Sequence, residues 1–282
     1  DTVLKFRNNA TFIRHHRGLN HSIPAVIFWG ITIASALYLF YPNVNFLHLW
    51  LWIFLAVMLH VFVDLFNAYG TQALRPFSNK WIAFGLINTF DPFIFILHVV
   101  GTLIWVLGGH PGYTWLLIYC ILTVYFVKRF IDKRAFVKQI YTQIPDVIEV
   151  VTSPTWKYHH WKVAVTTKHQ FLVGTVMNGH FDIIDTFKRV PLPDDPMMNV
   201  AKTDKNISAF LSFSPVYYWE KKVHKDYTEI RFIDLRYRSK EQYTFVAVVY
   251  IDRHLNILSS YTGWVFSEQK LKQKLSFSNH LI

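Results

Sequence analysis

Three histidines and an arginine stand together in the segment HHRGLNHSIP, residues 15–24, directly before a long apolar run. A second polar pair, His60 and Asp64, lies near the end of another apolar run, in LHVFVDLFNAYG at 59–70. If this run is a helix, four residues of spacing put the imidazole and the carboxylate one turn apart on the same face. Ionisable groups in apolar segments of this kind are costly, so they mark a candidate functional site.

Asp91 is a further candidate, because Asp91 and Pro92 stand at the start of a third apolar run. An aspartate there can cap the free amides of a helix, and proline suits the first turn. The candidate ligands at the ends of the apolar runs are His16, His21, His60, Asp64 and Asp91. Neutral imidazoles with carboxylates are the ligand set of zinc, or of manganese or iron, whereas calcium would use oxygen alone. There is room for one metal ion or two.

Each candidate also has a purely structural interpretation. A single histidine at a membrane interface is typical of packing or of a headgroup contact, and His60 with Asp64 could be a hydrogen-bonded pair. Asp91 taken alone fits a helix cap better than a metal ligand. The metal hypothesis depends on the joint placement of these residues, and the apolar segments decide that placement.

Four apolar segments, at about 23–41, 46–66, 92–107 and 113–127, are candidates to cross a membrane. A bilayer core needs about 20 residues of helix, so the third segment is the shortest candidate. The chain of 282 residues is 52% hydrophobic and 18% aromatic, which is unlike a soluble domain. None of the four resembles a cleavable signal peptide, because a charged, histidine-rich stretch precedes the first one. We therefore expect a multi-pass protein of the cell membrane.

The lysines and arginines predict its orientation. They lie before the first span, between the second and third, and after the fourth, while the connections at 41–45 and 108–112 contain neither residue type. The positive-inside rule then puts both termini in the cytoplasm. The candidate ligands would share the cytoplasmic surface and could converge there. His48 and His110 fall at the opposite face and His98 lies deeper in the third span, so we interpret them as interfacial or packing residues.

The formal net charge of +11 invites a nucleic-acid partner, but much of the basic charge adjoins the predicted spans. Anionic lipid headgroups account for such charge, and no recognition motif is present, so the expected partner is the lipid bilayer. The single cysteine, Cys120, lies within a predicted span and offers no disulfide.

Beyond the basic segment 128–139, which we expect to prolong the fourth span as an interfacial helix, the sequence pattern changes. Alternating apolar and polar residues predict strands, with a turn at MNGH, residues 177–180. The predicted strands are 161–166, 170–176, 228–238, 242–251 and 255–262. We interpret PLPDDP at 191–196 and the residues after it as an extended loop.

These patterns predict a helical membrane domain with its linker helix over 1–144, followed by a small, mainly antiparallel β domain in the cytoplasm over 145–282. The adjacent His159 and His160 would point to opposite faces of a strand, so they cannot easily share a ligand. No catalytic constellation is visible in this half. It could cover the membrane site or bind a protein partner.

Four segments, HRGLNHS (16–22), HVFVDLFNAYGT (60–71), RPFS (75–78) and DP (91–92), occur in this order between the spans. Together they resemble the YdjM-like family of membrane-bound proteins, for which metal-dependent hydrolase activity is inferred from these motifs. The likeness is greatest to its YfhP-type branch, because it extends to PTWKYHHW at 154–161.

The resemblance implies a cytoplasm-facing metal centre, most simply of zinc, with His16, His21, His60, Asp64 and Asp91 at the matching positions. Family members begin with a further apolar segment that ends in a proline and aspartates, and Asp1 corresponds to the last of these. The resemblance therefore implies Asp1 as another ligand. The His-x-x-x-Asp helix is also similar to a ligand pair of the helical zinc-dependent phospholipase C class, which implies phosphoester substrates.

A metal ion held by these ligands would polarise a phosphoryl oxygen and lower the pKa of bound water toward about 7. Asp64 or Asp91, where not a direct ligand, could accept the proton. Arg17 and Arg75 lie in the same predicted loops and could pair with phosphate oxygens, although positive-inside anchoring also explains either arginine. At headgroup depth, a lipid phosphoester is the natural substrate class. Asn67 and Thr71 are candidates to orient the ligands.

Two rival functions stay open. In one, the chain is a non-catalytic, membrane-anchored binding or regulatory protein with a structural metal. In the other it is a metal transporter, which would need polar groups through the full depth of the membrane, and the first and fourth spans offer almost none. A catalytic centre keeps an open coordination position and a structural site is closed, a difference that only a structure can show.

Overall fold

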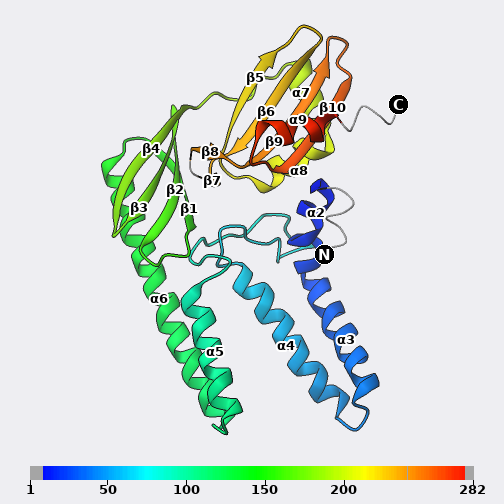
Figure 1. Ribbon diagram of the computed structural model, residues 1–282, viewed down its shortest axis with the longest axis vertical. Helices are drawn as coiled ribbons and strands as arrows, with labels where there is room; N and C mark the ends of the chain where they lie inside the picture. Colours follow the sequence, from blue (N-terminus) through cyan, green and yellow to red (C-terminus); the bar gives the residue numbers. More distant parts are fainter. Residues whose placement is uncertain (1–8, 240, 277–282) are drawn as a thin grey trace.

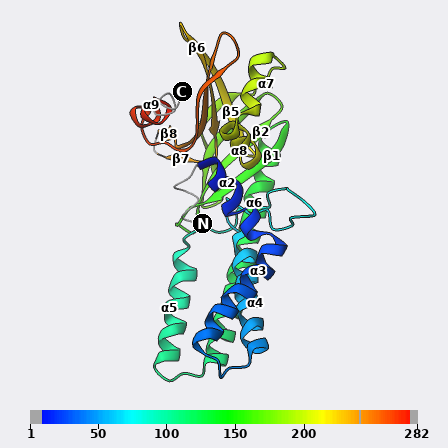
Figure 2. The same cartoon turned by 90° about the vertical axis from the view of Figure 1, so that its right-hand side faces the viewer.

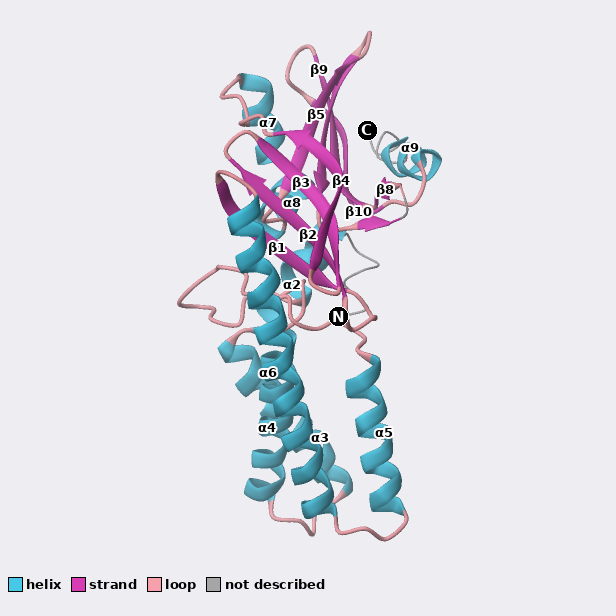
Figure 3. Cartoon of the chain, turned by 90° about the vertical axis from the view of Figure 1, so that its left-hand side faces the viewer, coloured by secondary structure: helices cyan, strands magenta, loops and turns pink. Residues whose placement is uncertain are grey.

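The computed structural model describes residues 9–239 and 241–276. Long helices make up one end of the molecule and two β sheets the other (Figure 1). Figure 3 shows all the strands in one half of the molecule and most of the length of the long helices, side by side, in the other. This arrangement confirms the predicted fold class, a helical membrane region followed by antiparallel β structure.

Four helices make up the apolar end: α3 (Ile23–Phe40), α4 (Phe46–Asp64), α5 (Pro92–Val106) and α6 (Pro111–Gln143). Helices α3, α4 and α6 are long and apolar enough to cross a membrane, and α5 is a shorter apolar helix of 15 residues. Helix α3 packs against α4, and α5 packs against α6. Most of their large apolar side chains face outward, as expected for helices whose solvent is lipid.

Side chains cap the starts of α3 and α5. Ser22 Oγ accepts a hydrogen bond from Ala25 N at the start of α3, with proline in the first turn. Asp91 Oδ1 accepts from Phe93 N and Ile94 N at the start of α5. The two connections without lysine or arginine both lie at the far end of the helices, and the basic connections lie toward the β sheets (Figure 1). The side of the membrane on which each end lies stays a prediction.

Helix α6 continues for 33 residues, so the predicted prolongation of the fourth span is confirmed. Its apolar residues Phe136 and Ile140 are buried against Trp161, Val163 and Val165 of the first sheet. One continuous helix therefore carries the chain from the apolar end into the β half.

The first sheet is an antiparallel meander in chain order. Its strands are β1 (Val147–Pro154), β2 (His160–Thr167), β3 (Gln170–Met177) and β4 (His180–Lys188). The predicted turn between β3 and β4 is confirmed. Asn178 and Gly179 have φ of 50° and 83°, the left-handed conformations that a two-residue hairpin turn requires.

The second sheet has the strand order β10-β9-β6-β5, also antiparallel. Its strands are β5 (Tyr217–Val223), β6 (Tyr227–Asp234), β9 (Phe245–Asp252) and β10 (Ile257–Trp264), with a small hairpin of β7 (Arg238–Ser239) and β8 (Gln242–Tyr243). Successive residues of β9 alternate between faces. Ala247 and Val249 pack among residues of α7 (Pro196–Thr203) and α8 (Lys205–Phe213), whereas Val246 and Val248 contact α9 (Glu268–Ser276).

The expectation of an extended loop after PLPDDP is wrong, because two short helices follow it. Asp195 Oδ1 accepts from Met198 N at the start of α7, and Pro196 occupies its first turn. Asp204 Oδ1 caps α8 in the same way, accepting from Asn206 N and Ile207 N. The proline and aspartates mark helix starts here, and helices of eight and nine residues become stable by burying one apolar face on the sheet.

The segment between α4 and α5 lies between the two halves of the molecule. Tyr69 stacks on Tyr237 with ring centroids 5.4 Å apart, and Trp81 meets Phe213 edge-on at 5.1 Å. Helix α2 (Asn9–His16) packs against α8 and β10 and leads directly into α3 (Figure 2). The segments next to the candidate ligands are thus packed against the β half of the molecule.

Candidate metal centre

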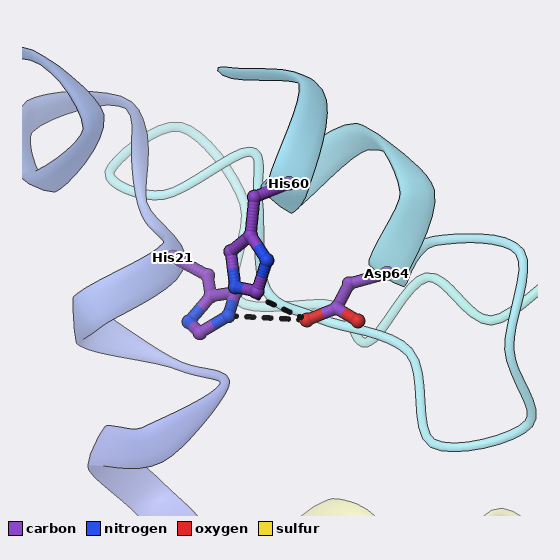
Figure 4. Close-up of side chains that lie close together, drawn as sticks. All are labelled: His21, His60 and Asp64. Carbon is purple, nitrogen blue, oxygen red and sulfur yellow. Dashed lines mark ion pairs between the residues drawn. The ribbon is translucent and has the colours of Figure 1, made fainter. Parts of the chain in front are cut away.

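Three of the predicted ligands meet where α3 begins and α4 ends. Figure 4 shows the imidazoles of His21 and His60 turned toward the carboxylate of Asp64. Asp64 Oδ2 lies 3.2 Å from His21 Nε2 and 3.9 Å from His60 Nε2. One ligand atom from each of the three residues lies within 4.8 Å of the others. The two imidazole rings are tilted, with centroids 5.4 Å apart.

The second oxygen of Asp64 faces a different set of partners. Arg17 Nη2 lies 3.4 Å from Oδ1, and Asn67 Nδ2 donates to the same oxygen at 3.1 Å. These two contacts fix the plane of the carboxylate and leave Oδ2 toward the imidazoles. Such support from neighbouring side chains is typical of carboxylates that hold a metal.

Hydrogen bonds between two loops bring the ligands together. His21 ends the short helix η1 (Leu19–His21), directly before the capping residue of α3. Gln72 N donates to Arg17 O at 2.9 Å, so the loop after α4 is tied to the loop before α3. A Cβ at Gly18 would lie 2.1 Å from Arg14 O, which makes glycine necessary for this close turn.

The site is buried on one side and open on the other. His21 is 5% exposed, while the side chain of Asp64 is 15% and that of His60 is 68% exposed. On the buried side the Arg17 guanidinium lies 5.3 Å from the ring centroid of Tyr69. Burial raises the pKa of the Tyr69 hydroxyl, so this ring is neutral and adds no charge beside the guanidinium.

The residues present fit a divalent transition metal. Two imidazole nitrogens and one carboxylate oxygen form the donor set of many zinc sites; His60 and Asp64 lie in successive turns of α4, and His21 ends the short helix η1. The exposed side at His60 leaves room for a further ligand from outside the protein. Arg17 opposes this fit in part, because its positive charge already compensates the carboxylate.

Asp91 is not part of this cluster among the residues that the structure describes. Its Oδ1 accepts from two backbone amides, and its Oδ2 accepts from Tyr125 OH at 2.7 Å. The capping role that the sequence suggested is confirmed. The ligand role stays a prediction without support from this geometry.

The other predicted site residues either have partners outside the cluster or lie outside the described part of the structure. Arg75 Nε donates to Asn79 Oδ1 at 2.8 Å within its own loop, and its carbonyl accepts from Ile23 N. Thr71 is fully buried and pairs with Ile82 through backbone bonds. His16 ends α2, but its side chain lies outside the described part of the structure, as does Asp1 altogether.

Three further histidines have the packing positions expected of them. His98 Nδ1 lies 2.7 Å from Ile94 O, and its ring contacts Trp115 and Tyr119. His48 and His110 lie at the starts of α4 and α6, at the end opposite the cluster.

Sequence reasoning missed the role of Arg129, which it counted only as a basic residue after the fourth span. Arg129 is 1% exposed, and its Nε donates to Leu86 O at 2.9 Å while NH1 donates to Tyr158 O. Its guanidinium also lies 3.9 Å from the ring centroid of Trp161. A buried arginine with these partners joins α6, the loop before α5 and the first sheet. Its neighbours in sequence gave no signal for this role.

Comparisons with known proteins divide the chain into three matched parts. Residues 1–136 match the YdjM inner membrane protein family, residues 145–187 the YfhP middle domain, and residues 196–275 the YfhP C-terminal alpha/beta plait domain. The chain is 59% identical over 280 residues to a Bacillus subtilis (strain 168) protein described as "Uncharacterized protein YfhP". That match covers 99% of this chain and 86% of the relative. No solved structure matches.

Proposed function

The chain belongs to the YdjM/YfhP family of membrane proteins, and on that premise we propose that it is a membrane-embedded, metal-dependent hydrolase. His21, His60 and Asp64 are the proposed metal ligands, and the proposed orientation puts both chain termini and this site on the cytoplasmic side. The proposed cofactor is zinc, with manganese or iron as alternatives of the same donor preference.

One observation carries the proposal: two imidazoles and one carboxylate oxygen converge at a site that is open on the His60 side. Catalytic zinc sites use three protein ligands and leave a position for water or substrate, whereas structural sites are closed by four. The three described ligands and the exposed edge fit the catalytic pattern.

The surrounding residues have definable tasks in such a reaction. A divalent metal, when bound, supplies Lewis acidity toward a phosphoryl oxygen and toward water. Asn67 and Arg17 hold Oδ1 of Asp64 and so orient its Oδ2 toward the imidazoles. Arg17 has further donors with which it could pair with a phosphate oxygen of a substrate. Asp91 has no proposed part in this step, since both its oxygens are occupied.

The proposed substrates are phosphoesters, with lipid headgroups as the first candidates. The site lies where α3 begins and α4 ends, two helices that are apolar enough to span a membrane, at the junction with the polar half. A hydrolytic centre at that depth meets phosphate groups of lipids before it meets other esters.

Elemental analysis of the detergent-purified protein tests the proposal directly. We expect near-stoichiometric zinc, manganese or iron in the parent protein and little in the His60→Ala, Asp64→Ala double variant. The matched control is His180→Ala, Asp182→Ala, which removes an exposed histidine and aspartate pair of β4 at 3.4 Å and should keep the metal. Absence of metal in the parent, or equal loss in both variants, would sink the metal-centre proposal.

Activity needs a separate measurement. The metal-loaded protein should cleave bis(p-nitrophenyl) phosphate to p-nitrophenol and p-nitrophenyl phosphate, or a phospholipid in micelles to an alcohol and a phosphomonoester, and the double variant should not. If the metal is present and no ester is cleaved, the catalytic part of the proposal fails and the metal-centre part stands.

The alternative function is a non-catalytic, membrane-anchored binding or regulatory protein with a structural metal. The Arg17 to Asp64 ion pair supports the non-catalytic part of this alternative, because part of the guanidinium is engaged by a carboxylate of the protein instead of a substrate phosphate. In that case removal of the metal with a chelator should lower the melting temperature of the protein without changing any hydrolytic rate.

A further inference from the structure

A second cavity lies away from the histidine cluster, where the two sheets meet the segment that connects α4 to α5. It has a volume of about 630 Å³, within the range of small-molecule sites. Its walls come from three parts of the chain: residues 68–69 and 87–89 between α4 and α5, residues 153–162 at the β1–β2 connection of the first sheet, and residues 236–239, 244, 264 and 266 next to the second sheet. The cavity therefore exists only when the three parts are assembled.

The lining of this cavity is strongly basic. Its charged residues are Lys157, Lys162, Arg236 and Arg238, with His160 between them in the chain, and no aspartate or glutamate is among the described lining residues. Two of these charges are compensated from outside the lining. Arg236 pairs with Asp234 at 2.7 Å, and Arg238 pairs with Asp185 at 2.6 Å.

The two lysines have no carboxylate partner among the described residues. Lys162 Nζ donates to the carbonyl oxygen of Arg238, and Lys157 lies 5.5 Å from the ring centroid of Trp156. Burial, together with the charge of Arg238, lowers the pKa of Lys162. An anion in the cavity would offset the unfavourable burial of the Lys162 ammonium, because it supplies the opposite charge at short range.

Two hydroxyl groups of the lining are also left without partners. Ser153 is 8% and Tyr237 is 9% exposed, and neither hydroxyl has a hydrogen-bond partner among the described residues. A buried hydroxyl without a hydrogen-bond partner is unfavourable, and both of these belong to residues of the cavity wall. The cavity wall thus combines two lysines that have no carboxylate partner among the described residues with two residues whose buried hydroxyls are unpaired.

We propose that this cavity binds the phosphate group of an anionic ligand, with Lys157 and Lys162 as its charge partners. Phosphate offers several acceptor oxygens and at least one full negative charge, which suits two ammonium groups and neighbouring hydroxyls. The group could belong to a soluble phosphate compound or to the headgroup of an anionic lipid. This site does not depend on the hydrolase proposal, because it shares no ligand with the histidine cluster.

Isothermal titration calorimetry on the chelator-treated, detergent-purified full chain tests the site with two probes. Inorganic pyrophosphate represents the soluble source, and short-chain phosphatidylglycerol, compared with short-chain phosphatidylcholine, represents the lipid source. The titrations are repeated in the His60→Ala, Asp64→Ala background. Binding that persists there separates this site from the proposed metal centre.

Lys157→Gln and Lys162→Gln should each weaken binding about tenfold, the effect of losing one charge-assisted hydrogen bond. Lys188→Gln is the matched control, since Lys188 is an exposed lysine at the end of β4, outside the lining. If Lys162→Gln does not fold, the exposed Lys157 carries the test. If pyrophosphate binds saturably and phosphatidylglycerol does not, the ligand is a soluble phosphate compound. If phosphatidylglycerol binds and phosphatidylcholine does not, the ligand is an anionic lipid.

Three results would overturn the proposal. They are absence of saturable binding of either anionic probe at millimolar concentration, unchanged affinity in both lysine variants, and equal weakening in Lys188→Gln.

Discussion

Asp64 and Asp91 are two aspartates at the same end of the helical region, yet they lie in opposite settings. Asp64 ends α4, and its Oδ2 faces two imidazoles. Asp91 precedes α5, and its oxygens are taken by two backbone amides and by the hydroxyl of Tyr125. The sequence presented both as candidate ligands, and the structure brings only Asp64 to the histidines.

The direction of the helix explains the difference. A helix begins with unpaired amides, which draw an aspartate at that position into a cap, and it ends with unpaired carbonyls, which offer an aspartate nothing. A carboxylate at a helix C-terminus is therefore left to be satisfied by other donors or by a metal. The comparison teaches that position along the helix, in addition to residue type, decides whether a carboxylate is available.

The surroundings extend this contrast. Near Asp91, Arg129 and Lys133 of α6 donate to the carbonyl oxygens of Leu86 and Phe84, so this side is a joint between helices and sheet. Near Asp64, the side chain of His60 is mostly exposed. The region around Asp91 fastens the two halves of the molecule, whereas the cluster around Asp64 leaves one candidate ligand, His60, exposed.

The largest expected effect is on metal affinity. Asp64→Asn should weaken metal binding by at least about 100-fold, more than the loss of a supporting residue does, whereas Asp91→Asn should leave it unchanged. Competition titration with a fluorescent zinc chelator measures both. Equal losses in the two variants would mean that Asp91 is a ligand after all and that the contrast is wrong.

The next effect is on stability at the joint. Arg129→Leu should lower the free energy of unfolding by about 3 kcal/mol, because two buried carbonyl groups lose their donor. Arg134→Leu is the control, since Arg134 is an exposed arginine of the same helix that contacts Phe130, and it should cost less than about 0.5 kcal/mol. Thermal unfolding in detergent gives both values, and the metal content should be normal in each variant. A stable Arg129→Leu protein would contradict the assigned joint.

A smaller effect is expected at the cap itself. Asp91→Ala should destabilise the protein by about 1–2 kcal/mol, through loss of the cap and of the Tyr125 hydrogen bond. Asp91→Asn should recover most of the cap, because asparagine is an equally good capping residue. Melting temperatures of the two variants, measured side by side, separate a cap from a charge requirement. If Asn were as damaging as Ala, the negative charge of Asp91 would matter more than its cap.

Much of this arrangement was predictable from local signals. The apolar runs indicated the helices, Asp91 with Pro92 indicated the start of α5, and alternation indicated the central strands. The four-residue spacing of His60 and Asp64 was enough to place both on one helix face, and the structure brings His21 to them. The assignment of metal and reaction remains a proposal.

Other features depended on contacts that have no local signal. Arg129 bonds carbonyl oxygens of residues 43 and 29 positions away, and a backbone carbonyl leaves no trace in the sequence. The helices α7 and α8 were missed because their stability comes from the sheet beneath them. The cavity between the sheets was not foreseeable either, since three distant segments build it.

The smallest predicted effect concerns Asn67, which supports the carboxylate of Asp64 and also shapes the turn that follows α4. Asn67 Nδ2 donates to Asp64 Oδ1, while Asn67 Oδ1 accepts from Tyr69 N and Gly70 N and so shapes the turn after α4. Asn67→Ala removes both functions, and Asn67→Ser keeps a turn acceptor but cannot reach the carboxylate. Both variants should therefore bind metal about tenfold more weakly, since the carboxylate loses a supporting donor. Only Asn67→Ala should also lose stability, by about 1 kcal/mol, in the same thermal measurement. If both variants kept full affinity, Arg17 alone would orient Asp64, and the support of Oδ1 would rest on the ion pair.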